Sequence, residues 1–376
     1  MGVGESIAAT VLCSRWYFAR GAMARPRRVG TVASLGAGTG LTFLPLTRCI
    51  VDAYGPDEVS PGAQRRVVLE ILRRAVEMEL VAHVFGDRVG PVYRRAGTAD
   101  GHPYADSGQA LAALERELGT VLRAVRLAAR LGDTELVCAL CRTLWPVQLK
   151  LGHLDEIVPA LKLAVRMTAT DPPDARVAAR MHVQLGLALG LAADRNGFGR
   201  HSGFRGHGRP GEAMAHLRRA ATMNEQAGDP LGQASAVEAQ GLVRLRQRRW
   251  KAALALFEAA ERILDRVSED TPGFAELHRA RALLLRGRGR ALNGLGRRDE
   301  ALALLTSARK RFSGIGDAYN VGRTLTDLAA VHLDRGAAAS ALPLVREAIP
   351  LLEREYATLH LGRLHELRQQ CVNRSG

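Results

Sequence analysis

The feature that most constrains the fold is a segment that recurs five times along the chain. Each copy is a turn followed by an amphipathic helix, and the copies begin at Gly152, Gly208, Gln247, Gly296 and Gly336. The sixth residue of each copy is Ala or Ile, the tenth is Leu or Val, and the thirteenth is always Ala. Offsets of four and three residues place these positions on one face of a helix. The recurrence predicts a run of packed helix pairs.

The recurring positions predict the seam along which one helix packs on the next. Small residues let two helices approach closely, and the larger residue between them fills the remaining space. The tenth positions are Leu161, Leu217, Leu256, Leu305 and Val345, and the thirteenth positions are Ala164, Ala220, Ala259, Ala308 and Ala348. The turn glycine of four copies supplies the positive φ that reverses the chain between two helices.

A second recurring signal marks where helices end and begin. Gly-Asp pairs occur at 132–133, 228–229 and 316–317. Glycine ends one helix, and aspartate caps the next by accepting hydrogen bonds from its first backbone N–H groups. Successive copies start 56, 39, 49 and 40 residues apart, and the longest spacing contains a Gly/His/Arg-rich insertion at 194–208. These distances fit helix pairs with short connections.

Composition agrees with helices and limits the classes of partner and compartment. Aromatic residues are only 5% of the chain, which is poor for sheets. The net charge is +15, but only four of the 53 basic residues are lysines, a ratio typical of GC-rich coding, so the charge argues weakly for nucleic acid. Five cysteines, an odd number, indicate a reducing cytoplasm. No stretch reaches the roughly 18 apolar residues of a membrane span.

The pattern of small residue, bulky apolar residue and Ala after a turn glycine resembles the second helix of a tetratricopeptide repeat. The first helices fit more loosely. Gly289 stands where the family has its helix-contact glycine and Ala329 can serve there, whereas Trp145 and Gln240 depart. The resemblance implies an all-α, right-handed superhelical array of about five helix pairs and a terminal helix, whose first helices line a concave groove.

The front of the array carries a more specific resemblance. Residues 110–165 are similar to the segment that opens the tetratricopeptide array in bacterial multidomain transcriptional regulators with an NB-ARC-type ATPase, of the antibiotic-regulatory type. Residues 42–100 resemble the winged-helix remnant and linker helix before that array. We therefore expect a poorly ordered segment at 1–41, this remnant at 42–100 and the array at 101–376. A Walker A sequence is lacking, so no ATPase and no nucleotide cofactor are expected.

Other motifs with chemical potential favour ordinary structural roles. The glycine-rich stretch 35–40 has no following lysine and is interpreted as a loop. Cys138 and Cys141 lack the second pair that structural zinc needs and are interpreted as core residues. The insertion holds His201 and His207, flanked by His182 and His216, but no carboxylate or cysteine completes a metal set. We expect no metal, no cofactor and, without any catalytic motif, no enzyme activity.

The strongest candidate for binding is the basic segment 244–298, with 14 basic and 6 acidic residues. Arginines that face a groove can hold an acidic side chain or peptide carboxylate of a partner, and the candidates are Arg281, Arg286, Arg288 and Arg290. A solvated face is an equally good interpretation. The sequence thus predicts a scaffold for protein or peptide partners with a regulatory or sensor role. The alternative is a nucleic-acid-binding transcriptional regulator acting through the N-terminal remnant and the basic segment.

Overall fold

The computed structural model of the chain describes residues 60–86, 90–96, 103–192 and 210–375. The chain divides into two compact units, Met1–Gln64 and Arg65–Gly376, and the second unit is described below. The segment predicted at 1–41, residues 42–59 of the predicted winged-helix remnant and the insertion at 194–208 lie outside the described residues.

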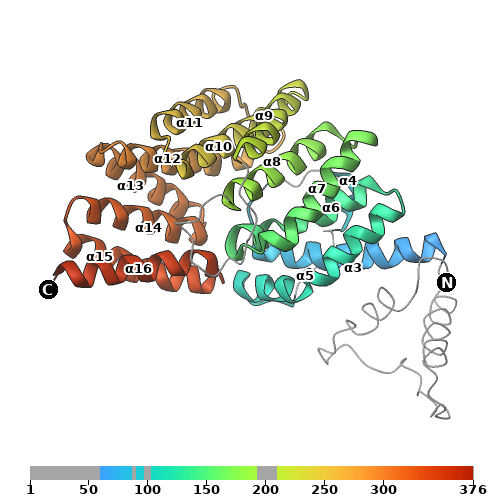
Figure 1. Cartoon of the computed structure of the whole chain (residues 1–376), viewed down its shortest axis with the longest axis horizontal. Helices are drawn as coiled ribbons and strands as arrows, with labels where there is room; N and C mark the ends of the chain where they lie inside the picture. Colours follow the sequence, from blue (N-terminus) through green and yellow to red (C-terminus); the bar gives the residue numbers. More distant parts are fainter. Residues whose placement is uncertain (1–59, 87–89, 97–102, 193–209, 376) are drawn as a thin grey trace, which may run out of the picture. The chain divides into compact units, whose positions relative to one another are not determined.

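Every helical element along the described ranges is shown in Figure 1, and these ranges contain no strand. The α-helices are α3 (Pro61–Ala82), α4 (Pro91–Ala96), α5 (Ser107–Arg130), α6 (Thr134–Thr143), α7 (Leu154–Thr170), α8 (Ala175–Ala192), α9 (Pro210–Gln226), α10 (Pro230–Arg246), α11 (Trp250–Leu264), α12 (Leu277–Gly294), α13 (Arg298–Gly314), α14 (Ala318–Asp334), α15 (Ala338–Arg354) and α16 (Thr358–Ser375). A π-helical turn, η2 (Val147–Leu151), follows α6, and a 3-10 turn, η3 (Phe274–Glu276), precedes α12. The predicted all-α class is confirmed.

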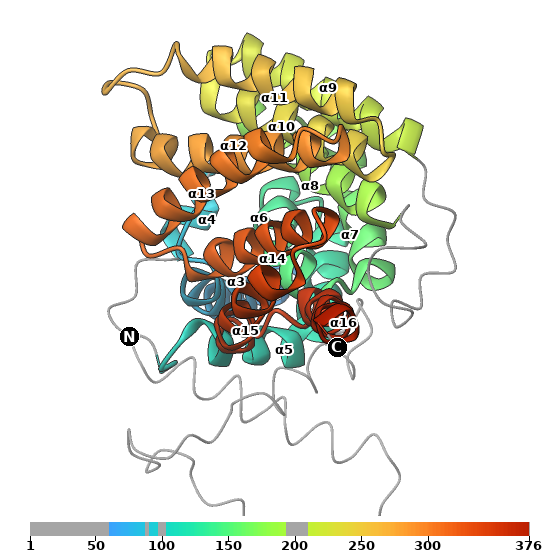
Figure 2. The same ribbon diagram turned by 90° about the vertical axis from the view of Figure 1, so that its left-hand side faces the viewer.

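Consecutive helices pack side by side in pairs (Figures 1 and 2). The pairs are α6 with α7, α8 with α9, α10 with α11, α12 with α13, and α14 with α15, and α16 packs on the last pair. The second helix of each pair carries one copy of the recurring segment. The predicted array of five helix pairs and a terminal helix is therefore present.

The recurring positions lie in buried seams in four of the five copies. In α7, α9, α13 and α15 the sixth, tenth and thirteenth positions are fully buried; they are Ile157, Leu161, Ala164, Ala213, Leu217, Ala220, Ala301, Leu305, Ala308, Ala341, Val345 and Ala348. On the opposite face of α13, Ala303 and Thr306 are exposed. One apolar stripe per helix thus carries the packing.

The third copy departs from the predicted register by one residue. In α11 the buried seam residues are Ala253, Phe257 and Ala260, each one position later than the sequence comparison placed them. Leu256 and Ala259, the predicted seam residues, are only partly buried. Their assignment to the seam is therefore corrected to the next residue in each case.

The reason for the shift is the turn before α11. Gly152, Gly296 and Gly336 take a positive φ at the start of their copies, and in the third copy Arg248 does so, with φ of 56°. The copy therefore begins at Arg248 and not at Gln247. Because a non-glycine residue occupies the left-handed turn, the glycine signal that sets the register elsewhere is missing here.

With the corrected register, the glycine contact between paired helices also recurs. A Cβ atom on Gly289 would lie 2.7 Å from Leu305 Cγ, and one on Gly241 would lie 2.6 Å from Phe257 Cε1. Both distances are too short for any side chain, so both glycines are required for the approach of the two helices. Gly241, and not Gln240, therefore occupies the helix-contact position of its pair.

The three Gly-Asp pairs cap helices as their sequence predicts. The side chain of Asp133 accepts a hydrogen bond from the Leu136 backbone N–H at 3.0 Å at the start of α6. Asp229 does the same at α10 and Asp317 at α14, at 2.8 and 3.0 Å. The glycine before each aspartate has a positive φ. These turns set the direction of the first helix in three of the five pairs.

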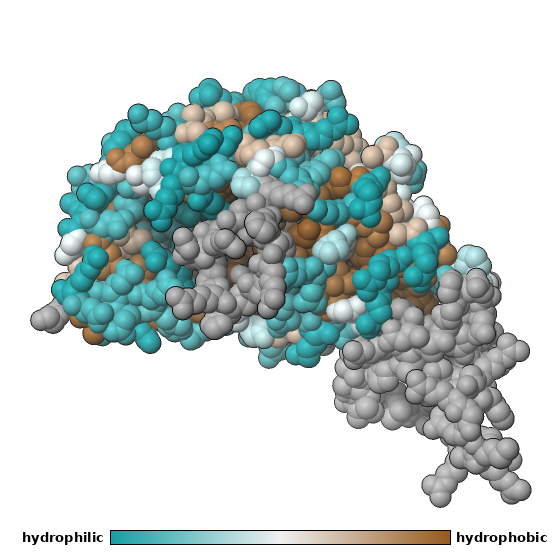
Figure 3. Space-filling view, in the orientation of Figure 1, coloured by the Kyte–Doolittle hydropathy of each residue, from teal (hydrophilic) through white to brown (hydrophobic). Residues whose placement is uncertain are grey.

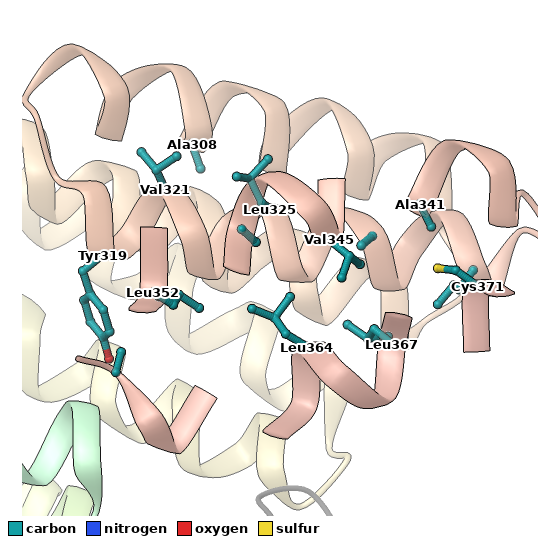
Figure 4. Close-up of a cluster of buried hydrophobic side chains, with 14 of the residues drawn as sticks. Ala308, Tyr319, Val321, Leu325, Ala341, Val345, Leu352, Leu364, Leu367 and Cys371 are labelled. Carbon is teal, nitrogen blue, oxygen red and sulfur yellow. The ribbon is translucent and has the colours of Figure 1, made fainter. Parts of the chain in front are cut away.

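The C-terminal part of the core is closed by α16 (Figure 4). Leu364, Leu367 and Cys371 of α16 are buried against α14 and α15, where they meet Leu325 and Val345. The charged residues of α16 lie on its other face, where Arg363 and Glu366 are exposed. The helix covers the apolar end of the last repeat.

The two ends of the array contact each other (Figures 1 and 2). Helix α16 packs on η2, and α15 packs on α5. Lys150 Nζ in η2 donates hydrogen bonds to Glu355 Oε2 at 2.6 Å and to the Ala82 carbonyl oxygen at 2.7 Å. The Tyr319 hydroxyl donates to the Leu149 carbonyl oxygen at 3.1 Å. These contacts join the two ends of the array. The first helices of the pairs therefore surround an interior space that the joined ends help to close.

Candidate binding site in the arginine-lined cavity

The first helices of successive pairs line a cavity with a volume of about 900 Å³. Side chains of α8, α10, α12, α14 and α16 contribute to it. Its lining includes ten arginines and five carboxylates, a formal excess of five positive charges. The surface over α11 to α15 is mostly hydrophilic as well, at the left of the view in Figure 3. Among the described residues, the cavity is therefore a concave surface with a strong excess of positive charge.

Two arginines of α12 share one carboxylate of α14. Arg286 Nε lies 2.7 Å from Asp327 Oδ2, and Arg290 Nε lies 3.5 Å from Asp327 Oδ1. The first contact has the distance of an ion pair but not the alignment of a hydrogen bond. The Arg286 side chain is only 8% exposed. Burial, the largest cause, and the charge of Arg323 together lower the pKa of Arg286 to about 9.

Arg323 of α14 adds a third guanidinium beside this pair. Its Nη1 donates to Asn320 Oδ1 at 3.0 Å, and its guanidinium carbon lies 5.1 Å from the centre of the Tyr319 ring. Its Nε is buried without a hydrogen-bond partner. Within the part of the chain that the structure describes, no carboxylate lies at ion-pair distance from Arg323. The positive charge at this point of the cavity wall is not neutralised locally.

Glu238 of α10 lines the same cavity and is half-buried. Burial raises the pKa of its carboxyl to about 7, although the charges of Arg279, Arg323 and Arg286 act in the opposite direction. The described residues provide it with no ion pair. The cavity thus contains one carboxyl group that is easily protonated near neutral pH, which further reduces the negative charge available to the arginines.

Arg279 also lines the cavity but has a structural role. Its Nε donates to Asp317 Oδ2 at 2.8 Å, and Asp317 is the residue that caps α14. Asp317 also accepts from the Asn320 side-chain amide at 2.7 Å. The interaction joins α12 to the start of α14 and holds Asn320 in place beside Arg323.

The structure separates the four arginines proposed from the sequence. Arg286 and Arg290 line the cavity. Arg281 lies 3.3 Å from Asp265, and Arg288 lies 3.4 Å from Glu261; both carboxylates belong to the α11 region. The four side chains do not converge on one point, because α12 places them on two faces.

Sequence reasoning missed Glu238 and three residues of α14 in the cavity wall. Tyr319, Arg323 and Asp327 follow each other at four-residue intervals along α14, which places them on one face of that helix. This spacing was a usable signal, but it belongs to one repeat only and does not recur. Glu238 had no such signal, because only the fold brings it opposite α12 and α14.

The cysteine and histidine pairs singled out in the sequence lie elsewhere. Cys138 and Cys141 are buried, and burial raises the pKa of the Cys138 thiol to about 12. His182 Nδ1 and His216 Nδ1 are 2.9 Å apart between α8 and α9. Among the described residues no group of three or more metal-binding side chains comes together. The same residues contain no helix that is long and apolar enough to cross a membrane.

The fold and the cavity define a helical-repeat scaffold with a charged interior. Comparison with known families makes this class more specific: residues 278–354, the span of α12 to α15, match the tetratricopeptide repeat family. The predicted resemblance to tetratricopeptide repeats is thereby confirmed for this part of the chain. Such repeats are protein-interaction modules.

A solved structure from Pyrococcus horikoshii, a Signal Transduction ATPase with Numerous Domains protein with a tetratricopeptide repeat sensor, aligns with 12% sequence identity and a TM-score of 0.41. The alignment covers 86% of this chain, which spans 56% of that protein's chain. No curated protein matches the sequence.

Proposed function

We propose that this chain is a regulatory or sensor module that binds an acidic segment of a partner protein in its arginine-lined cavity. The tetratricopeptide repeats support the scaffold role, because they bind protein partners. The single observation that carries the chemistry is the unneutralised guanidinium of Arg323 beside the shared pair of Arg286 and Arg290. Carboxylates of a partner would supply the negative charge that the cavity wall lacks.

The size of the cavity limits what enters it. A volume of about 900 Å³ lies near the upper end of the range of pockets for small ligands. It suits a short extended segment and is too small for a folded domain. The partner would therefore contribute a loop or a chain end, while the rest of it stays outside.

The regulatory role rests on two resemblances to NB-ARC-type regulators: residues 42–100 resemble the winged-helix remnant and linker helix that join the ATPase to the array, and residues 110–165 resemble the segment that opens the array. By that resemblance, the module senses its partner and passes the signal to other parts of a transcriptional regulator. A cytoplasmic location and the lack of enzymatic activity remain expectations of this proposal.

A binding experiment with labelled peptides tests the proposal. Fluorescence anisotropy would compare a library of short Asp/Glu-rich peptides with composition-matched Asn/Gln peptides. We expect binding of the acidic library only, and about a tenfold loss of affinity or more in Arg323→Gln, as for the loss of a charged hydrogen-bond partner. Arg309→Gln is the matched control, because Arg309 lies on α13 and pairs with Glu347 at 2.7 Å. Equal binding of acidic and neutral peptides would contradict the proposal.

A DNA-retention experiment addresses the nucleic-acid alternative. Arg281 and Arg288, in the basic segment 244–298, already face carboxylates of the α11 region, which reduces the charge available to phosphates of a nucleic acid. We therefore expect no retention of random-sequence duplex DNA at physiological salt. Retention that is lost in Arg286→Glu/Arg288→Glu would favour the alternative.

A further inference from the structure

The side chains of Arg286, Arg290 and Arg323 can donate more hydrogen bonds than their surroundings accept. Arg286 and Arg290 both approach Asp327 through Nε. Their terminal Nη atoms have no partner among the described residues, and Arg323 has one, Asn320. Because a guanidinium donates five hydrogen bonds, most of the donors of this group remain available to a ligand.

The charge of the group is also unbalanced. The guanidinium groups of Arg286 and Arg290 face the single carboxylate of Asp327, and among the described residues no carboxylate lies at ion-pair distance from Arg323. Burial raises the pKa of Glu238, one of the five carboxyl groups that line the cavity, to about 7. The excess is about two positive charges, in a wall where Arg286 is almost completely buried. Like charges held together under these conditions favour a ligand with two negative charges over one.

We propose that Arg286, Arg290 and Arg323 form a subsite for a phosphoryl group carried on a side chain of the partner segment. This inference rests on the proposed function and names the group that the cavity selects. The occupant is a phosphate monoester, and its source is a phosphorylated residue of the bound segment.

Charge favours a phosphoryl group over a carboxylate. A phosphate monoester carries a charge of about −1.5 to −2 at neutral pH, whereas a carboxylate carries one charge. A single phosphate dianion therefore neutralises the excess positive charge of the cavity wall. Two carboxylates would have to enter together to do the same.

Geometry points the same way. Arg286 and Arg290 are one helical turn apart on α12, and Arg323 comes from α14. Donors from two helices reach a ligand from different directions. A tetrahedral phosphoryl group presents three oxygens in three directions, whereas a carboxylate presents two in one plane.

The arginine of α14 is preorganised for this role. The Tyr319 ring lies against its guanidinium, and the Tyr319 hydroxyl is held by the Leu149 carbonyl oxygen at 3.1 Å and by His360 Nε2 at 2.8 Å. Asn320, fixed by Asp317, holds Nη1. Less rotamer freedom is therefore lost when Arg323 binds a ligand.

Three matched probes test the inference: short acidic peptides with a central phosphoserine, and their twins with Asp or Ser at that position. Anisotropy competition would measure each against the full chain. We expect the phosphoserine peptides to bind at least about tenfold more tightly than the Asp twins. In Arg323→Gln and Arg290→Gln this preference should disappear, while Arg309→Gln keeps it. Arg290 is 30% exposed, so its variant is expected to fold even if one at Arg286 does not.

The outcomes separate this inference from the proposed function. Equal affinity for the phosphoserine and Asp peptides would overturn the phosphoryl subsite and leave acidic-segment binding intact. Loss of binding by all three probes would overturn both. Binding of free phosphoserine or inorganic phosphate as tightly as the peptide would overturn the assignment to a partner side chain. A phosphoserine preference that survives in both arginine variants would overturn the assignment of the subsite to these arginines.

Discussion

The pairs α10/α11 and α12/α13 reach the same packing with different residues. In α12/α13 the turn residue is Gly296, and Leu305 packs against Gly289. In α10/α11 the turn residue is Arg248, and a phenyl ring packs in place of the leucine. That ring also lies 2.7 Å from the position that a Cβ on Gly287 of α12 would occupy. The larger side chain thus requires a second glycine, on the next repeat.

The difference teaches which parts of a repeat are interchangeable. The helix-contact glycine is kept in both pairs, because the side chain packed against it, Phe257 or Leu305, leaves no space for a Cβ. The turn glycine is replaced by a strained arginine, since the cost of a left-handed residue there is only about 1–2 kcal/mol. Packing geometry is therefore more strictly maintained than turn chemistry.

Overfilling the seam of α12/α13 should have the largest effect. Ala308 is fully buried between helices, and Ala308→Trp is expected to lower the free energy of unfolding by about 3 kcal/mol or more, at the upper end for overpacked cores. Urea titration followed by circular dichroism would measure it. Ala303→Trp on the exposed face of the same helix is the control and should change stability little. An unchanged midpoint in Ala308→Trp would show that the seam is misplaced.

Adding one methyl group to the other pair should have the next largest effect. Gly241→Ala forces a Cβ against the Phe257 ring and should destabilise by about 1–3 kcal/mol. Phe257→Leu in the same chain should recover part of this loss, because a leucine is accommodated at the equivalent place in α13. A double-mutant cycle would measure the coupling. Additive effects of the two changes would disprove the direct contact.

Acid should weaken the pair α8/α9. Here Gly186 contacts Leu217 as Gly289 contacts Leu305, and a His182 to His216 hydrogen bond is added. Burial, the largest cause, and the charge of His216 together lower the pKa of His182 to about 4. The unfolded chain, with a pKa near 6.5, therefore takes up the proton first. The contribution of His182 to the free energy of unfolding is fully present above pH ~6.5 and is lost as the pH falls towards 4.

The expected loss is about 1–2 kcal/mol, since His182 is only partly buried and solvent screens its charge. Melting curves at pH 7 and pH 4.5 would measure it. In His182→Gln the difference between the two pH values should be smaller by that amount. The same pH difference in both proteins would assign the acid sensitivity to other groups.

Restoring glycine at the strained turn should give the smallest effect and the opposite sign. Arg248→Gly removes the strain of a left-handed arginine and should stabilise by up to about 1 kcal/mol, reduced by the greater freedom of glycine in the unfolded chain. Arg248→Ala removes the same side chain without relieving the backbone, so it should bring no gain. Thermal melts of the two variants would separate backbone strain from charge, and equal stabilities would exclude the strain.

The sequence predicts what repeats and misses what does not. The seam residues of α7, α9, α13 and α15 recur in type and spacing, so they follow from one chain alone. The register of α11 was lost where Arg248 replaced the turn glycine. The cavity wall was found only in part, because Arg286 and Arg323 come from different repeats and no periodicity links them. Their proximity depends on how far each pair rotates relative to the last.

The contact between Lys150 and Glu355 changes how such an array is expected to unfold. The two residues are separated by 205 positions in the chain. In an open repeat array, each repeat is stabilised by its neighbours and the terminal repeats fray first. Here each terminus is a neighbour of the other, so loss of α16 also removes support from η2. We therefore expect that the array has no end that frays independently. Once the contact between Lys150 and Glu355 breaks, unfolding should spread along the array from both sides of it.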